Sequence, residues 1–187
     1  ETTVACGLAC KHCRAFAMPT AGEGELSTEE GLRLLDQITG FGKPYPHIVF
    51  TGGDPLRRKD LFTLIEAARE RGIGASLAPA STPDLTYDGL VSLKEAGIQT
   101  ISLSLDGSTA DLHDTFRGVP GTFDHTVRAA GWAHELGIPL QVNTLVTDTT
   151  LADLPAIYDL MVEMKIMRWS LFFLITMGRG KGMQEIT

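Results

Sequence analysis

Three Gly-Ile pairs divide the chain into repeating units. At Gly72-Ile73, Gly97-Ile98 and Gly137-Ile138, a segment with helical periodicity ends at the glycine and a short strand-like run follows. Glycine suits the position just past a helix because it enters the left-handed backbone region at little cost. Helices that alternate with short strands specify parallel βαβ units with right-handed crossovers. The chain is therefore expected to be an α/β protein built on a parallel sheet.

The periodicity predicts six strands and five helices in a single domain that covers the whole chain. Ser27 and Glu30 form a capping box that opens the first helix, which is expected to run to about Gly40. Six units are too few for a complete eight-stranded barrel, which leaves an open partial barrel or a doubly wound sheet. Both place an active site at the C-terminal ends of the strands. The clearest strands are 2–5, 48–50, 101–105, 140–145 and 169–175.

Charge and hydropathy exclude two classes of partner. A formal net charge of -7 without a clustered basic face argues against an electrostatic grip on nucleic acid. The apolar run at 171–175 is far too short to span a bilayer, and there is no leader with a basic start and an apolar middle. We therefore expect a soluble, cytoplasmic protein with neither a nucleic acid nor a membrane as partner. Because the chain begins at Glu1 and ends at Thr187 just after a glycine-rich stretch, we also expect it to be trimmed at both ends.

All three cysteines lie in one short segment, Cys6-Gly-Leu-Ala-Cys10-Lys-His12-Cys13. An odd number of clustered cysteines cannot form an internal disulfide framework, so they are expected to be metal ligands or reactive thiols in a reducing compartment. Thiolates this close together favour a soft metal or an iron-sulfur cluster. A redox pair of Cys10 and Cys13 remains an alternative, as does a structural zinc that includes His12. The pair would leave Cys6 without a role, and the zinc would require strained ligation by adjacent residues.

The cysteine spacing, CxxxCxxC after a first predicted strand, resembles the signature of the radical S-adenosylmethionine (SAM) superfamily. The resemblance implies that Cys6, Cys10 and Cys13 hold a 4Fe-4S cluster whose fourth iron is free to bind SAM. It also places His12 where the family usually has an aromatic residue near the adenine of SAM.

A second motif, Gly52-Gly53-Asp54-Pro55, directly follows a predicted strand. By itself this sequence is typical of a tight turn into a helix that begins near Asp60. After such a cysteine loop it resembles the GGEP motif of the same superfamily, with Asp54 in place of the usual Glu. The resemblance implies that the backbone of Gly52, Gly53 and Asp54 receives the amino group of SAM.

A third motif follows a later strand, where Ser104-Leu-Asp106-Gly precedes His113-Asp-Thr-Phe-Arg117. It resembles the SLDG...HDxxR pattern of superfamily members that modify peptides or tetrapyrroles. The resemblance implies that Ser104 lies by the ribose of SAM and Arg117 by its carboxylate, which a planar guanidinium can hold with two bonds, and that Asp106 also belongs to the site. His113 is expected to be a surface or helix-start residue. Asn143, on the next strand, is either a further SAM contact or a buried amide satisfied by the backbone.

Two places depart from the family pattern, and one further stretch carries no clear motif. Arg14 replaces the common aromatic residue after the third cysteine, and 77–81 replaces the usual Thr-Asn-Gly, which bears on the substrate more than on SAM. The stretch 178–182, Gly-Arg-Gly-Lys-Gly, lacks the spacing of a phosphate-binding loop. It is expected to be the loop after the last strand, either close to SAM or simply flexible.

The resemblance implies a partial (β/α)6 TIM-like barrel of parallel strands with outer helices, and a radical SAM enzyme. The chain most resembles catalytic domains followed by a SPASM or twitch extension, including haem-pathway enzymes and peptide maturases such as that for mycofactocin. Any auxiliary clusters are then expected beyond residue 187. The expected partners are a flavodoxin or ferredoxin-type electron donor and a small-molecule or peptide substrate. The competing hypothesis, a structural zinc or electron-transfer module without SAM chemistry, leaves the glycine motif and Arg117 unexplained.

Overall fold

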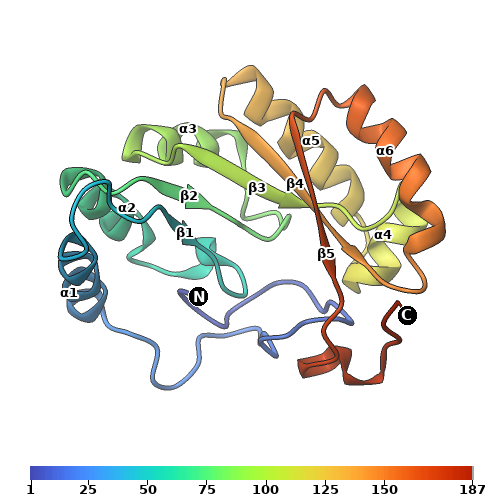
Figure 1. Cartoon of the computed structure of the whole chain (residues 1–187), viewed down its shortest axis with the longest axis horizontal. Coiled ribbons are helices and arrows are strands. Elements are labelled where there is room, and N and C mark those ends of the chain that lie inside the picture. Colours follow the sequence, from blue (N-terminus) through green and yellow to red (C-terminus); the bar gives the residue numbers. More distant parts are fainter. Residues whose placement is uncertain (187) are drawn as a thin grey trace.

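Five parallel strands form one sheet whose spatial order follows the chain order, β1-β2-β3-β4-β5. The computed structural model describes residues 1–186. A sheet without a reversal of strand order is the wall of a barrel, because a doubly wound sheet reverses its order at a switch point. The predicted α/β class and partial barrel are therefore confirmed (Figure 1). The strands are β1 (Ile48–Phe50), β2 (Ala75–Leu77), β3 (Thr100–Ser104), β4 (Leu140–Val146) and β5 (Arg168–Phe173).

The helices follow the outer side of this sheet, and the N-terminal segment crosses the opposite, open side (Figure 1). The predicted capping box is present at the first helix, where the amide of Glu30 donates to Ser27 Oγ at 3.2 Å and the amide of Ser27 donates to Glu30 Oε2 at 2.8 Å. The α-helices are α1 (Thr28–Thr39), α2 (Leu61–Glu70), α3 (Tyr87–Ala96), α4 (Ala110–Arg117), α5 (Thr122–Glu135) and α6 (Leu154–Glu163). Short 3-10 helices are η1 (Pro55–Arg57), η2 (Leu151–Asp153) and η3 (Gly178–Gly182).

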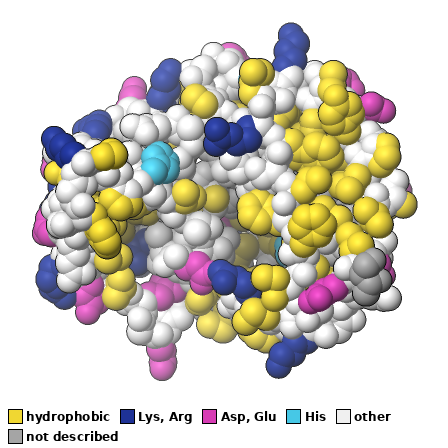
Figure 2. Space-filling view, in the orientation of Figure 1, with side chains coloured by type: hydrophobic (Ala, Val, Ile, Leu, Met, Phe, Trp, Pro, Cys, Tyr) yellow, Lys and Arg dark blue, Asp and Glu magenta, His cyan; other side chains and the backbone are white. Residues whose placement is uncertain are grey.

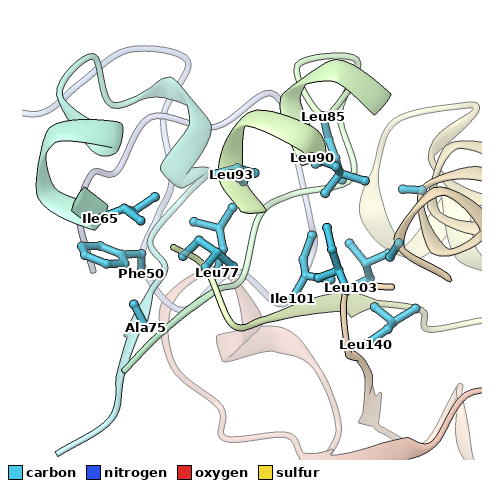
Figure 3. Packing of buried hydrophobic residues seen from close by; sticks show 14 of the residues in the cluster. Phe50, Ile65, Ala75, Leu77, Leu85, Leu90, Leu93, Ile101, Leu103 and Leu140 are labelled. Atoms are coloured by element: carbon cyan, nitrogen blue, oxygen red, sulfur yellow. The ribbon is translucent and has the colours of Figure 1, made fainter. Parts of the chain in front are cut away.

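The main core lies between the sheet and the helices that cover it (Figure 3). Burial alternates along β3 and β4, since side chains in a strand point to opposite faces. On β3, Ile101 and Leu103 are fully buried against the helices, while Ser102 and Ser104 on the other face are only half-buried. The apolar face of the sheet therefore packs outward, and the polar face lines the inside of the partial barrel.

The predicted first strand, residues 2–5, does not join the sheet. Its amides and carbonyls bond instead to the segment after β1: Thr2 N donates to Thr51 O at 2.6 Å, and Gly53 N donates to Thr3 O at 2.7 Å. Ala5 makes an isolated bridge with Met18. The described residues thus form five strands rather than six, because this segment lies beside the C-terminal end of β1 and not along its length.

Helix α4 was not among the five predicted helices. Thr109 caps it by accepting a hydrogen bond from the Leu112 amide at 3.4 Å, and Gly118, with φ of 75°, ends it in the left-handed conformation. The expectation that His113 is a surface or helix-start residue is wrong, because His113 lies inside α4 with 1% exposure. Its Nδ1 accepts a hydrogen bond from the Asp106 amide at 3.0 Å.

No helix within residues 1–186 combines the length and the apolar character needed to cross a bilayer.

Candidate functional site

The three cysteines line one pocket of about 560 Å³ at the C-terminal ends of the strands. The same pocket is lined by Gly52 and Gly53 after β1, by Ser104 at the end of β3 and by Asn143 on β4. On the face shown in Figure 2, a hollow opens near the centre, and apolar side chains gather beside it over β5 and its surroundings. The sequence motifs, far apart along the chain, are thus brought to one cavity.

Each cysteine sulfur has one hydrogen-bond donor. All three cysteines are free thiols, with Cys6 and Cys10 buried and Cys13 half-buried. Burial, reinforced by the nearby Asp54 and the other two cysteines, raises the pKa of the Cys6 thiol, and the bond from the Leu8 amide opposes this. The donors are Leu8 N to Cys6 Sγ (3.3 Å), Ala17 N to Cys13 Sγ (3.3 Å) and Arg117 Nη1 to Cys10 Sγ (3.9 Å).

The two glycines after β1 allow a close approach between backbone segments. A Cβ atom on Gly52 would overlap the carbonyl oxygen of Thr3, and one on Gly53 would lie 2.5 Å from the carbonyl oxygen of Ala5. Both positions therefore require glycine, because the segment that leads into the cysteines packs directly on them. The backbone on the pocket side stays uncovered by side chains.

The Asp54 side chain points away from this pocket. Its carboxylate is fully buried and accepts hydrogen bonds from Thr82 Oγ1 at 3.0 Å and from the amides of Leu56 and Ala80 at 3.2 Å and 3.4 Å. Burial raises the pKa of Asp54, and these hydrogen bonds partly offset the effect. Asp54 fastens the end of β1 to the segment after β2, and its amide donates to the Ala5 carbonyl oxygen at 2.6 Å. Asp54 does not itself line the pocket.

Ser104 and Asn143 face each other across neighbouring strands. They are register partners in the β3–β4 pairing, and both are half-buried on the inner face. Gln141 Nε2 donates to Asn143 Oδ1 at 2.7 Å, which orients the Asn143 amide. The two positions offer a hydroxyl and an amide side by side at the pocket wall.

Arg117 is held between an acid and a thiol. Its Nη2 forms an ion pair with Asp106 Oδ2, and the side chains of Asp106 and Arg117 are 0% and 13% exposed. The second oxygen of Asp106 accepts a hydrogen bond from the Leu145 amide at 2.7 Å. Arg117 lines the pocket and its buried Nε has no partner among the described residues. Asp106 itself does not line the pocket, so it serves to position Arg117.

His12 presents a neutral ring to the pocket. It stacks on Phe116 with ring centroids 4.6 Å apart and an interplanar angle of 18°. Burial, followed by the positive charge of Arg117, lowers the pKa of His12 to about 4. Its buried Nδ1 has no hydrogen-bond partner within residues 1–186. A flat, uncharged ring with one unused nitrogen suits contact with a planar heterocycle.

Sequence reasoning missed Arg179 as a site residue. The stretch 178–182 was expected to be a loop, either close to SAM or flexible, with no residue singled out. It is the 3-10 helix η3, and Arg179 lines the cysteine pocket. The Arg179 amide donates to the carbonyl oxygen of Cys13 at 3.0 Å. The sequence signal for Arg179 was a charged residue inside a glycine-rich stretch after the last strand. That stretch matches no ligand-binding motif.

A single metal ion fits this pocket poorly. In the part of the chain that the structure describes, no group of three or more His, Cys, Asp and Glu side chains is arranged to hold one ion. A tetrahedral zinc would therefore need the cysteine side chains to rearrange. An iron-sulfur cluster spreads its thiolates over separate irons, and three free thiols on one pocket wall with donors to their sulfurs suit that chemistry.

The sequence matches a family model and curated relatives. The family model described as the Radical SAM superfamily matches residues 1–161. An AdoMet-dependent heme synthase of Oleidesulfovibrio alaskensis is 42% identical over 189 residues, covering 100% of this chain and 48% of the relative. A PqqA peptide cyclase of Rhizobium meliloti is 31% identical over 168 residues, covering 90% of this chain and 44% of the relative.

Solved structures show the same fold. Streptococcus suis SuiB bound to S-adenosylmethionine superposes with a TM-score of 0.76 and 22% identity, over 91% of this chain and 39% of that one. The chain spans about half the length of the curated relatives it matches. With the family model matching most of its length, the chain belongs to the Radical SAM superfamily.

Proposed function

We propose that this chain is the SAM-cleaving part of a radical enzyme, in which Cys6, Cys10 and Cys13 hold a 4Fe-4S cluster and the rest of the pocket holds SAM. One observation carries the proposal: the three free thiols and the polar strand ends line a single cavity of about 560 Å³. Thiolates alone would suit a structural metal, and strand-end polar groups alone would suit many ligands. Their combination suits a cofactor and a cosubstrate in contact.

The chemistry that such a cluster supplies is one electron, which splits SAM into methionine and a 5'-deoxyadenosyl radical able to remove hydrogen from a substrate. The chain supplies three thiolates, and the amides of Leu8 and Ala17 and the guanidinium of Arg117 donate to them. These donors lower the cost of gathering negative charge at the three sulfurs. Three protein ligands would leave one iron of such a cluster for SAM.

The remaining wall of the pocket has groups suited to each part of SAM. The backbone after β1, at Gly52 and Gly53, lines the pocket and suits the amino group, while Asp54 keeps this segment in place. Arg117 also lines the pocket and suits the carboxylate, because its Nε has no partner within residues 1–186. Ser104 and Asn143 offer a hydroxyl and an amide to the ribose hydroxyls. The neutral ring of His12 suits the adenine. Asp106 acts through Arg117, which it keeps in place by their ion pair.

The substrate we propose is a peptide or a tetrapyrrole-type molecule, supported by relatives named as heme synthases and a peptide cyclase. Exposed Phe172 and Phe173 at the pocket rim would suit an apolar part of such a molecule. The electron would come from a flavodoxin or ferredoxin-type donor in a reducing cytoplasm. We place any auxiliary-cluster domain beyond residue 187.

The proposal is tested on anaerobically reconstituted protein by iron and sulfide content and by 5'-deoxyadenosine formed from SAM with dithionite. Wild type is expected to bind about four irons per chain, the content of one 4Fe-4S cluster, and to form 5'-deoxyadenosine. Cys10→Ala removes one ligand and is expected to abolish 5'-deoxyadenosine formation.

The control is Ser92→Ala, because Ser92 is exposed on α3 and does not line the pocket. It should load iron and cleave SAM as wild type does. Stoichiometric zinc without SAM cleavage would overturn the proposal in favour of a structural metal domain. Redox cycling of a cluster without consumption of SAM would overturn it in favour of an electron carrier.

A further inference from the structure

The 3-10 helix η3 is fastened onto the cysteine loop. At its base, Glu185 Oε1 accepts hydrogen bonds from the amide and the hydroxyl of Thr176, both at 3.0 Å. At its start, a Cβ atom on Gly178 (φ of 59°) would overlap the Cys13 carbonyl oxygen, so the contact requires glycine. This packing fixes the backbone of the next residue, Arg179, against the segment that carries the third cysteine.

Two hydrogen bonds, one from its backbone and one from its side chain, hold Arg179 against the segment that carries Cys13. Its amide donates to Cys13 O at 3.0 Å, and its Nη1 donates to Ala17 O at 3.5 Å. The Ala17 amide itself donates to Cys13 Sγ at 3.3 Å. The guanidinium therefore lies at the Cys13 corner of the cysteine set.

No carboxylate within residues 1–186 forms an ion pair with Arg179. Its Nε and Nη2 are buried without a hydrogen-bond partner, and no ion pair involves it within residues 1–186. Two acids of this region already have partners. Asp106 forms an ion pair with Arg117, and Glu1, which lines the pocket, forms one with Arg14 at 2.7 Å. A shielded guanidinium with unused donors is costly unless an anion meets it.

The two pocket arginines therefore differ in kind. Arg117 is neutralised by Asp106, so it adds directed hydrogen bonds but little net charge. Arg179 has no such acid within residues 1–186, so it adds net charge to the pocket that it lines. A cluster with three thiolate ligands is negative in its oxidised state and gains one more negative charge on reduction. A fixed cation beside it stabilises the reduced state more than the oxidised state.

We propose that Arg179 binds the 4Fe-4S cluster at its Cys13 corner and raises the reduction potential of that cluster, which makes the first electron easier to accept. This inference rests on the proposed function, because it needs the cluster. The electron comes from the external reductant and no bond of the protein forms or breaks. A carboxylate of SAM is the competing anion for the same guanidinium, and the test separates the two.

The test is a potentiometric titration of the reconstituted protein, followed by the EPR signal of the reduced cluster and carried out without SAM. Arg179→Gln removes the charge and keeps a polar side chain. We expect the equilibrium constant for reduction to fall about tenfold, a midpoint shift of about 59 mV to lower potential for a one-electron couple. Lys181→Gln is the matched control, because Lys181 belongs to η3, carries the same charge and is exposed. It should keep the midpoint of wild type.

A midpoint that does not move in Arg179→Gln would overturn the inference, and so would an equal shift in Lys181→Gln. A shift that appears only after SAM is added would assign Arg179 to the SAM carboxylate instead. Arg179→Lys keeps the charge with fewer donors and should lie between wild type and Arg179→Gln. If Arg179→Gln fails to load iron, Arg179→Met removes the same charge and keeps an unbranched side chain. Its midpoint must then lie below that of Lys181→Gln, and equality of the two would overturn the inference. Iron content of wild type is measured first, so failure of the cluster assignment is recognised separately.

Discussion

The two faces of β3 and β4 carry different kinds of side chain and do different work. On the outer face, Leu103 and Val142 are 0% exposed and pack under the helices. On the inner face, Ser104 and Asn143 are half-buried at the wall of the cysteine pocket. Successive residues of one strand thus belong to the core and to the site in turn. Substitutions at neighbouring residues of one strand should therefore change either the stability or the ligand binding of this protein, but not both.

The ends of the strands are the place where this separation fails. Asp106 follows β3 and is buried, yet it holds the pocket arginine Arg117. Substitutions there should affect both stability and the site, whereas substitutions within the strands should affect only one of them. The predictions below test that division, beginning with the strand end.

Asp106→Asn should give the largest effect, a loss of about 3–5 kcal/mol in the free energy of unfolding, because it leaves the Arg117 guanidinium without its buried partner. Urea unfolding of the apoprotein measures it. Asp148→Asn removes an exposed acid and should change the stability by less than about 0.5 kcal/mol. Equal stability of the two variants would mean that the ion pair with Arg117 contributes little and that the strand end is no exception.

Leu103→Ala probes the outer face and should cost about 2–5 kcal/mol of unfolding free energy, since it empties a fully buried site. The folded protein should still bind SAM as wild type does, because Leu103 points away from the pocket. Leu112→Ala makes the same deletion at a side chain that is 47% exposed on α4 and should cost far less. Weakened SAM binding in folded Leu103→Ala would break the separation of the two faces.

His113 makes stability depend on pH in one direction. Burial lowers its pKa to about 4 from the reference value of 6.5, so between these values the unfolded chain binds a proton that the folded chain does not. Stability should be unaffected above pH 6.5 and should fall as the pH is lowered toward 4. At pH 5 the loss from this residue amounts to about 2 kcal/mol, at about 1.36 kcal/mol for each pKa unit.

Urea unfolding at pH 7 and pH 5 tests this dependence. His113→Asn keeps an acceptor for the Asp106 amide and should lose less stability between the two pH values than wild type. His134→Asn, at an exposed position of α5, should behave as wild type does. The reverse order, with His113→Asn losing more on acidification, would contradict the burial of a neutral His113.

The architecture was predictable because it depends on periodic signals. The glycines that end helices and the capping box at Ser27 are local, and alternation of apolar residues marks the strands. The segment 2–5 was expected to be a first strand that is cut short. Its backbone bonds go to Thr51 and Gly53 rather than to β1, and only the three-dimensional path of the chain decides that.

The site was predictable where motifs exist and not where packing decides. The cysteines, Ser104 and Asn143 do line one pocket, as their motifs suggested, while their roles toward SAM stay predictions. The inward or outward direction of the Asp54 side chain depends on Thr82, which belongs to another loop. Arg179 reaches the pocket only because Gly178 allows a close approach to Cys13. Neither contact leaves a periodic trace in the sequence.

Ser104→Ala probes the inner face and should have the smallest effect on stability, within about 0.5 kcal/mol, because its side chain fills no apolar space. If its hydroxyl donates to SAM, the loss of one hydrogen bond should weaken SAM binding by about 0.5–1.5 kcal/mol, roughly 2- to 12-fold in Kd. Equilibrium dialysis of cluster-loaded protein measures the affinity. Ser92→Ala, on the exposed surface of α3, should change neither quantity. If Ser104→Ala is stable and binds SAM as wild type does, the inner face still contributes little to stability, but Ser104 does not contact SAM. Asn143 would then be the strand residue to test.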